Sequence, residues 1–276
     1  MKKLTPNAFG VNFFMLRYLK LSFALFRYSL SRELMFKANL ILWVVVEFLW
    51  FAIQLAMVEV IFSHVRELAG WNKYEMILLI GTSHLVQQLF QFVFMINCID
   101  LPENVRMGKL DFFLLQPASS QFLVSIRKFD VGALVNGSIG LAFTIYAVWK
   151  LNIHPSALQI VLYAALVANG ALIHYALMLA IVTLSFWIVR AQGLVYGYYN
   201  LFQITRIPRD AFKGVVKLFF MFGLPMLVVA NYPAEVLAQR LWSWHILWVF
   251  ALAFGFVALA SAWFRFGLRF YTSASS

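Results

Sequence analysis

Long apolar blocks constrain this chain more than any other feature of its sequence. Blocks of roughly 20 residues with almost no charge recur along it, and a helix of that length can cross the hydrocarbon layer of a membrane. A helix also satisfies its backbone hydrogen bonds within one segment, as lipid surroundings require. Hydrophobic residues make up 63% of the 276 residues and charged residues only 12%, far from the balance of a soluble domain. The sequence therefore predicts an all-α, polytopic membrane protein.

Six blocks are predicted to be transmembrane helices within a single domain. They are residues 38–62, 76–97, 132–150, 157–189, 193–207 and 242–264. Ahead of them, residues 9–37 place Arg17, Lys20 and Arg27 on one helical face and apolar side chains on another. That pattern predicts an N-terminal helix lying in the membrane interface, although an ordinary basic flank of the first span would explain the charges as well.

The fifth span has two alternative layouts, since only one of two apolar segments can cross if both chain ends share one side. Residues 193–207 are moderately apolar, whereas residues 215–230 are strongly apolar but broken by Gly223 and Pro225. Hydropathy and the neighbouring basic residues favour 215–230. The broken helix and the polar side chains of 193–207 favour the other layout, because irregular backbone is tolerated where protein shelters it. We adopt 193–207 as the span and residues 208–240 as an outer re-entrant segment.

Basic residues predict which side of the membrane the chain ends occupy. Lys and Arg concentrate in cytoplasmic segments, and seven precede the first span: Lys2, Lys3, Arg17, Lys20, Arg27, Arg32 and Lys37. Both termini are therefore expected in the cytoplasm. The net charge of +11 is expected to meet anionic lipid head groups. No basic stripe carries its own folded domain, so nucleic acid is not an expected partner.

Several kinds of chemistry have no motif in this sequence. Cys98 is the single cysteine, so no internal disulfide forms. The residues before Gly108 and Lys109 lack the glycine of a Walker A motif, and neither a hydrolase nor a zinc-protease signature occurs. The five histidines are far apart in sequence, without the i, i+4 spacing of a helical metal site. We expect no enzyme activity, metal or cofactor in this chain.

Three polar stripes at helical spacing lie inside predicted spans. They comprise Trp43, Glu47, Trp50 and Gln54; His84, Gln87, Gln88 and Gln91; and Tyr196, Tyr199, Asn200 and Gln203. Polar groups are costly against lipid, so they should face other helices or water. The stripes fit either a translocation pathway or hydrogen bonding between helices. As a pathway, the residues we single out are Glu47, Trp50, Gln54, Gln87, Gln91, Tyr196, Tyr199, Asn200 and Gln203.

The polar segment 101–117 reads L-P-E-N-V-R-M-G-K-L-D and then L-L-Q-P. It resembles the I-R-x-G-x-L-D-x-x-L-L-x-P signature of ABC-2 type permeases, in the subfamily with six spans. Four further motifs resemble that subfamily in the same order, around Phe186-Trp187, Ile207–Phe212, Tyr232–Leu237 and Gly267–Thr272. Two residues depart from it: Arg209 stands where the family has an apolar residue, and Lys213 where it has proline.

The resemblance implies an exporter of the bacterial plasma membrane. Two permease chains, identical or paralogous, would pair and form the substrate pathway. Two copies of a separate ATPase subunit would bind ATP and Mg and dock on the cytoplasmic face. Segment 101–117 would be the coupling helix seated in the ATPase, through Arg106, Gly108, Lys109, Leu110, Asp111 and Pro117.

Two other function classes stay open on the residues alone. One is a membrane-embedded enzyme that modifies lipid, which would need acids and histidines to converge. The other is an ion-driven carrier with Glu47 as the proton or ion site. The substrate is not indicated by the sequence.

Overall fold

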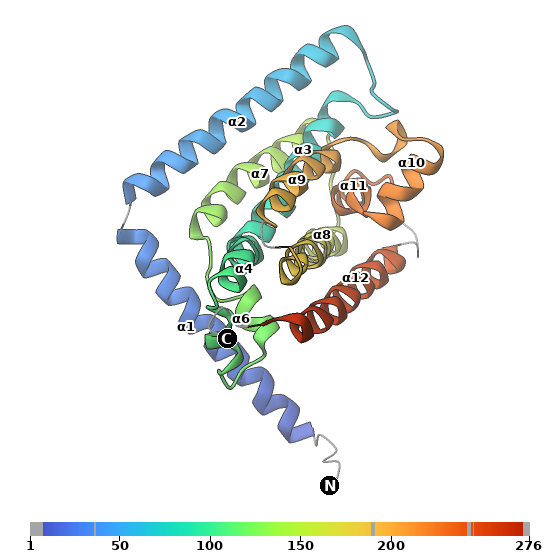
Figure 1. Cartoon of the computed structure of the whole chain (residues 1–276). Helices are drawn as coiled ribbons and strands as arrows, with labels where there is room; N and C mark the ends of the chain where they lie inside the picture. The colour runs from blue at the N-terminus through green and yellow to red at the C-terminus, as the bar shows by residue number, and fades with distance from the viewer. Residues whose placement is uncertain (1–7, 36, 189–190, 242–243, 245, 273–276) are drawn as a thin grey trace.

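The computed structural model describes residues 8–35, 37–188, 191–241, 244 and 246–272, and its regular elements there are all helical (Figure 1). Lys2, Lys3 and Arg190, which entered the sequence arguments, lie outside the described residues, as do the last residue of the predicted 157–189 span and the first residues of 242–264.

The helices follow one another along the chain with short connections. In order they are α1 (Ala8–Met35), α2 (Lys37–His64), α3 (Lys73–Phe90), η1 (Gln91–Met95), α4 (Ile96–Arg106), α5 (Leu110–Leu114), α6 (Ser120–Ser125), α7 (Val131–Lys150), α8 (Ala157–Thr183), η2 (Leu184–Phe186), α9 (Gln192–Phe202), η3 (Gln203–Arg206), η4 (Arg209–Ala211), α10 (Gly214–Leu218), η5 (Phe219–Gly223), α11 (Met226–Leu237), α12 (Ile246–Gly267) and η6 (Leu268–Phe270).

Among the described residues, five helices are long and apolar enough to cross a membrane. They are Ile41–His64, Lys73–Arg106, Val131–Lys150, Ala157–Phe186 and Ile246–Phe270. This confirms an all-α polytopic membrane protein with five candidate spans, or six if one bent helix pair counts as a span.

The bent pair is the segment predicted to be re-entrant. Gly214–Gly223 and Met226–Leu237 meet at 87° across Leu224 and Pro225, where proline interrupts the helical hydrogen bonds. Residues 192–206, which hold all but the last residue of the predicted 193–207 span, form α9 and η3. At 1.5 Å per residue they cover about 22 Å, less than the ~30 Å hydrocarbon layer, so they are not among the candidate spans on length.

The second span is longer than the predicted 76–97. An Asn72–Glu75 capping box starts α3 early: Asn72 Oδ1 accepts from Glu75 N at 3.1 Å, and Glu75 Oε2 accepts from Asn72 N at 2.8 Å. The helix then passes through the π turn η1 and continues as α4 to Arg106. Consequently the first residues of the predicted coupling segment prolong this helix.

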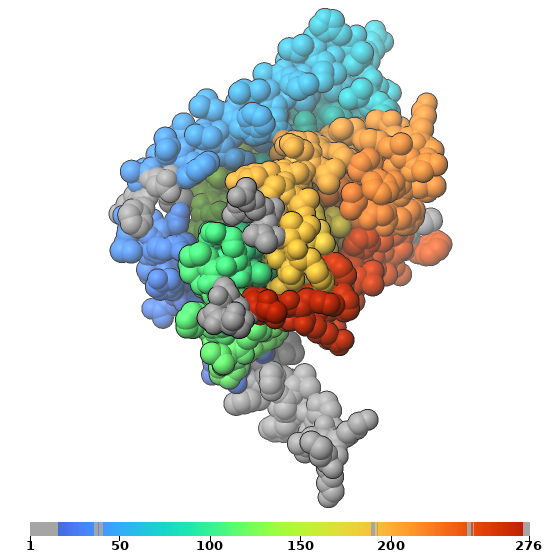
Figure 2. Space-filling view, viewed as in Figure 1, coloured from blue at the N-terminus to red at the C-terminus, as the bar shows by residue number. Residues whose placement is uncertain are grey.

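The core of the bundle lies around α3 and α8. About 72% of the most apolar stretch of α8 is buried, against 11% for α2. The helices α11 and α12 pack on α8, and α7 packs on α3. By contrast, α2 forms one edge of the molecule along its whole length (Figures 1 and 2).

Glycines allow α3 and α7 to approach closely. A Cβ atom placed on Gly140 would lie 2.9 Å from His84 Cδ2 and 3.1 Å from the carbonyl oxygen of Gly81. Small residues at such crossings are what membrane helices use to pack. The close crossing positions His84 beside α7.

Two arginines that follow α9 form hydrogen bonds and ion pairs with other segments, one of them near the start of α3. Arg240 Nη2 donates to the Gly70 carbonyl at 2.9 Å and to Glu75 Oε2 at 2.5 Å, and its guanidinium lies 5.2 Å from the centre of the buried Trp71 ring. Arg209, which departs from the family pattern, forms an ion pair with the buried Glu235 at 3.0 Å. The charge of Arg209, which an apolar residue would lack, is therefore paired within this chain.

Candidate functional site

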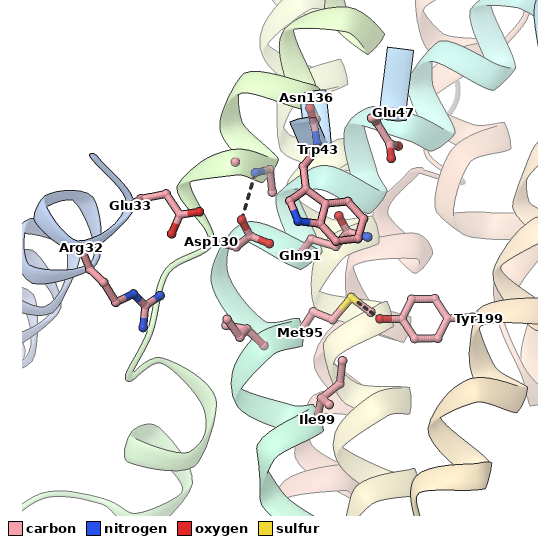
Figure 3. Close-up of a pocket in the computed structure, with 13 residues that line it drawn as sticks. Arg32, Glu33, Trp43, Glu47, Gln91, Met95, Ile99, Asp130, Asn136 and Tyr199 are labelled. Carbon is pink, nitrogen blue, oxygen red and sulfur yellow. Dashed lines mark hydrogen bonds between the residues drawn. The ribbon is translucent and has the colours of Figure 1, made fainter. Parts of the chain in front are cut away.

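A half-open pocket of about 360 Å³ lies between α1, α2, the α3–α4 helix, α7 and α9 (Figure 3). Its lining consists of Arg32, Glu33, Trp43, Glu47, Gln91, Met95, Ile96, Ile99, Asp130, Gly132, Ala133, Asn136 and Tyr199. Five separate stretches of chain thus meet around one cavity, whose lining is part polar and part apolar.

The pocket has charged residues where α1 ends and where α7 begins. Arg32 and Glu33 come from the last turn of α1. Asp130 caps α7, accepting from Ala133 N at 3.2 Å. Burial raises the pKa of the Asp130 carboxyl above its ordinary value, although the backbone N–H groups and Arg32 favour its charged form.

Glu47 lies deeper, where α2 faces α3. Gln88 Nε2 donates to Glu47 Oε1 at 3.1 Å, and His84 Nδ1 lies 3.6 Å from the same oxygen. The other ring nitrogen of His84 lies 3.1 Å from the backbone oxygen of Asn136 on α7. This acid of α2 is therefore held by two residues of the neighbouring span.

A guanidinium approaches the same cluster from η3. Arg206 Nη2 donates to Gln87 Oε1 at 2.9 Å and interacts electrostatically with Glu47. A second link joins η3 to α3, because Ser83 Oγ and Thr205 Oγ1 lie 2.5 Å apart. The cluster contains charges of both signs inside the bundle, where an isolated charge would be costly.

The predicted stripe on α2 divides between two environments. Glu47 and Trp43 line the pocket, and Gln54 is half-buried. Trp50 is 52% exposed, since the inward face of α2 continues through the buried Phe51 instead. Trp50 therefore does not share the environment of Glu47.

The predicted stripe on α3 turns inward throughout. His84 and Gln88 are buried, and Gln87 and Gln91 are half-buried. Gln91 lines the pocket from the first residue of the π turn.

The predicted stripe on α9 meets the pocket at one residue. Tyr199 lines it and donates to Met95 Sδ at 3.3 Å. Tyr196 is 71% exposed, and Asn200 and Gln203 are exposed as well. Within one chain, the structure thus brings together Glu47, Gln91 and Tyr199 and leaves the other residues of this stripe, Tyr196, Asn200 and Gln203, on the surface.

Sequence reasoning did not single out Arg206, Asp130 or Asn136 for this site. Arg206 continues the helical spacing of Tyr199 and Gln203, and that spacing was the available signal. Asp130 directly precedes an apolar block, which is the sequence pattern of a helix N-cap. Asn136 had no signal, because only the packing of α7 against α3 shows where it lies.

The predicted coupling segment forms a turn and a short helix. Gly108 adopts a φ of 68° after α4, a left-handed conformation that glycine takes without strain. Arg106 binds the Glu103 carboxylate with two nitrogens at 2.9 and 2.6 Å. Arg106, Lys109 and Pro117 are exposed, Gly108 and Asp111 are partly buried, and Leu110 is buried.

The start of the chain holds the end of this segment. Arg17 Nη2 donates to the Pro117 carbonyl at 3.0 Å, and Ser119 N donates to the Tyr18 hydroxyl at 2.9 Å. The Tyr18 ring also meets the Phe122 ring edge-on, with centroids 4.7 Å apart. Helix α1 and the 117–122 stretch therefore form one unit.

The short helix α6 connects this segment to two long helices. Gln121 Nε2 donates to the Tyr175 hydroxyl on α8 at 3.0 Å and to Ser261 Oγ on α12 at 2.8 Å. Lys128 and Asp100 form an ion pair at 2.5 Å, which holds the following loop against α4. Motion of the segment would consequently reach three spans.

Comparison with known proteins gives one match. Residues 48–275 match the family described as "ABC-2 family transporter protein". No curated protein and no solved structure matches the chain. The matched stretch begins one residue after Glu47, so the α1 and α2 side chains of the pocket precede it.

Proposed function

Since this chain belongs to the ABC-2 transporter family, and is thus a membrane component of an ABC transporter, we propose that it is the permease subunit of an exporter. In this proposal two permease chains pair in the bacterial plasma membrane, and a separate ATPase subunit binds ATP and Mg. Both termini lie in the cytoplasm, on the side of α5 and α6.

The observation that carries the coupling part of this proposal is the exposed apolar surface on the 101–117 segment. Phe112 is 68% exposed and Leu115 is 82% exposed, next to the charged Arg106 and Lys109. Exposed apolar side chains beside charged ones suit the binding of a protein partner. Burying the apolar side chains stabilises a complex, and the charged side chains around them give specificity. The ATPase subunit is the partner that the family implies.

The route from ATPase to pathway would run through contacts already described. Closure of two ATPases on ATP would move the 101–117 segment. Gln121 would pass that motion to α8 and α12, and the Lys128–Asp100 pair would pass it to α4. The permease needs only two conformations, since the partner supplies the energy.

The substrate pathway is proposed to include the pocket and, across the dimer, the exposed α9 residues. Glu47, Gln87, Gln91 and Tyr199 lie in or beside the pocket of one chain. Trp50, Tyr196, Asn200 and Gln203 are exposed on the single chain and would face the second permease or lipid. The low burial of α2 supports a further packing partner.

Charge reversal tests the coupling role. We expect Arg106→Glu and Asp111→Lys to uncouple ATP hydrolysis from export, with export lowered by about tenfold, ~1.4 kcal/mol of coupling. Insertion and chain level should stay unchanged. Lys150→Glu, at the opposite end of α7, is the matched control. Normal coupling in both variants would refute the assignment of this segment.

An ion-driven carrier is the second candidate, favoured by the Glu47–His84 contact at 3.6 Å. The two functions differ in their energy source. Transport by the purified complex in vesicles should require ATP and persist when the proton gradient is collapsed. Transport that follows the gradient and ignores ATP would favour the carrier.

A further inference from the structure

We propose that the pocket between α1, α2, the α3–α4 helix, α7 and α9 binds the ammonium group of an amphiphile. The inference rests on the proposed transport function and names the chemical class of its substrate. The residues that carry it come largely from α1, α2 and α7.

Charge is the first observation. Three carboxylates line the pocket, from Glu33, Glu47 and Asp130, against the single guanidinium of Arg32. Arg32 interacts with Asp130, and Glu47 contacts His84 and Gln88 and interacts with Arg206, which lies outside the lining. Glu33 is thus the carboxylate of the lining in excess of these two pairs. A cleft with an excess of one sign attracts ligands of the other, most strongly where low-dielectric walls focus the field.

An unsatisfied acceptor is the second observation and is independent of the first. Asn136 is 9% exposed, lines the pocket, and its Oδ1 has no hydrogen-bond partner among the described residues. A buried acceptor without a donor is costly, and native proteins rarely keep one without a reason. This oxygen has almost no accessible surface, so a rotation of the Asn136 side chain would be needed to bring it to the cavity, where an ammonium N–H would satisfy it.

The remaining walls suit the rest of an amphiphile. The Trp43 and Tyr199 rings both line the pocket, and aromatic faces attract organic cations. Met95, Ile96 and Ile99 provide an apolar surface for a hydrocarbon tail. Anions find two guanidinium groups, Arg32 in the lining and Arg206 beside Glu47, and each already has an acidic neighbour.

The depth of the residues gives a direction of approach. Arg32, Glu33 and Asp130 lie at the ends of helices, whereas Glu47 and Asn136 lie within the spans α2 and α7. A head group could therefore pass from the membrane surface to the interior along carboxylates. An ammonium group is carried both by free cationic amphiphiles and by zwitterionic lipids.

Two ions of matched shape and opposite charge test the proposal. The full chain, co-purified with its partner subunits, is placed in nanodiscs of phosphatidylglycerol, and binding of labelled tetraphenylphosphonium and tetraphenylborate is measured against empty nanodiscs. We expect saturable binding of the cation only. The triple variant Glu33→Gln, Glu47→Gln, Asp130→Asn should weaken it by at least about tenfold, and Asn retains the capping ability of Asp130.

Glu59→Gln is the matched control, because it removes an acid of α2 that pairs with Lys73 away from the pocket. Equal binding of the anion, or cation binding unchanged in the triple variant, would overturn the proposal. Decylammonium and decyltrimethylammonium as competitors test Asn136: Asn136→Leu should weaken the first by more than the second, and equal loss would overturn the role of its carbonyl.

Lipid composition separates the two sources of the ammonium group. Replacing half of the phosphatidylglycerol by phosphatidylethanolamine should lower cation binding more than replacing it by an uncharged glycolipid, which dilutes the membrane charge equally, if the site takes a lipid head group. The two replacements should have equal effects if the site takes a free cation. Failure of the site is distinguishable from failure of the transport function. A complex that couples ATP hydrolysis to export but binds no cation refutes the site alone. A chain that binds the cation but associates with no ATPase subunit refutes the function alone.

Discussion

At the scale of residues, polar side chains from different elements meet and contact one another inside the bundle. Glu47, His84, Gln88 and Arg206 come from three separate elements and meet inside the bundle. Each would be costly if it faced lipid alone. Their mutual contacts explain why a chain with so few charges keeps several of them in its apolar part.

Glu47→Gln separates the charge of this residue from its hydrogen bonding. Glutamine can still accept from Gln88 but leaves Arg206 without a nearby anion, and an uncompensated buried charge is destabilising. We expect transport to fall by about tenfold with near-normal chain level, whereas Glu47→Leu should lower both. Vesicle transport and quantitative blotting measure the two effects, with Glu59→Gln as control. If both substitutions at residue 47 are silent, Glu47 is neither a pathway residue nor a packing residue.

Tyr198→Phe tests a buried pair that lies outside the pocket. The Tyr198 hydroxyl forms a hydrogen bond with His174 Nδ1. The Phe90 ring meets the Tyr198 ring edge-on, and the Phe202 ring stacks on His174. Without the hydroxyl, a buried ring nitrogen loses its partner at a cost of about 1–3 kcal/mol. The midpoint of thermal unfolding should fall, while Tyr196→Phe on the surface should leave it unchanged. Equal midpoints for both variants would contradict the importance of the pair.

Part of the site could be predicted from single residues, and part could not. Polar residues at helical spacing pointed to Glu47, Gln91 and Tyr199 because such residues avoid lipid. The same spacing could not exclude Trp50, since which flank of α2 turns inward depends on Phe51 packing against His84 and Phe143. Asn136 required knowledge of how α7 crosses α3.

At the scale of elements, helix caps and glycines determine where the helices begin and end, which hydropathy alone does not. The five candidate spans among the described residues overlap apolar blocks of the sequence. Their ends moved because the capping box at Asn72 starts α3 before its apolar run and Gly108 ends α4 after it. Likewise, α9 is short because η3 follows it at Gln203, a change of helix type that the apolar pattern does not encode.

Gly140→Ala tests the close crossing of α3 and α7. The added methyl group would lie within 3.1 Å of Gly81 backbone and 2.9 Å of His84, and overpacking of this kind costs about 1–3 kcal/mol. Thermal stability of the purified chain should fall. Gly197→Ala is the matched control, because nothing lies within 4 Å of a Cβ there. Similar losses in the two variants would contradict the importance of the crossing, because Gly→Ala within a helix favours the helix by itself.

At the scale of the whole molecule, the topology of the 208–240 segment decides how many spans the chain has. The 87° bend suits a segment that enters the membrane and returns. We predict that Asp210, half-exposed and paired with Lys217, lies outside the cell. In a Cys98→Ser background, Asp210→Cys should react with an impermeant thiol reagent in intact cells. Leu115→Cys, on the exposed coupling segment, should react only after the membrane is opened. Labelling of residue 210 only in opened cells would make 215–230 the fifth span.

The contacts between α1 and the 117–122 stretch have a consequence for synthesis of the chain. Arg17 and Tyr18 leave the ribosome about 100 residues before Pro117 and Ser119, and Ser29 precedes its partner Phe129 by the same interval. At roughly 5–20 residues per second, that delay is about 5–20 s. During this time α1 lacks these partners, and two candidate spans, α2 and the α3–α4 helix, are made before it can dock. The first helix to be made is thus among the later ones to reach its final place. A truncated nascent chain released before residue 117 would carry α1 without these contacts.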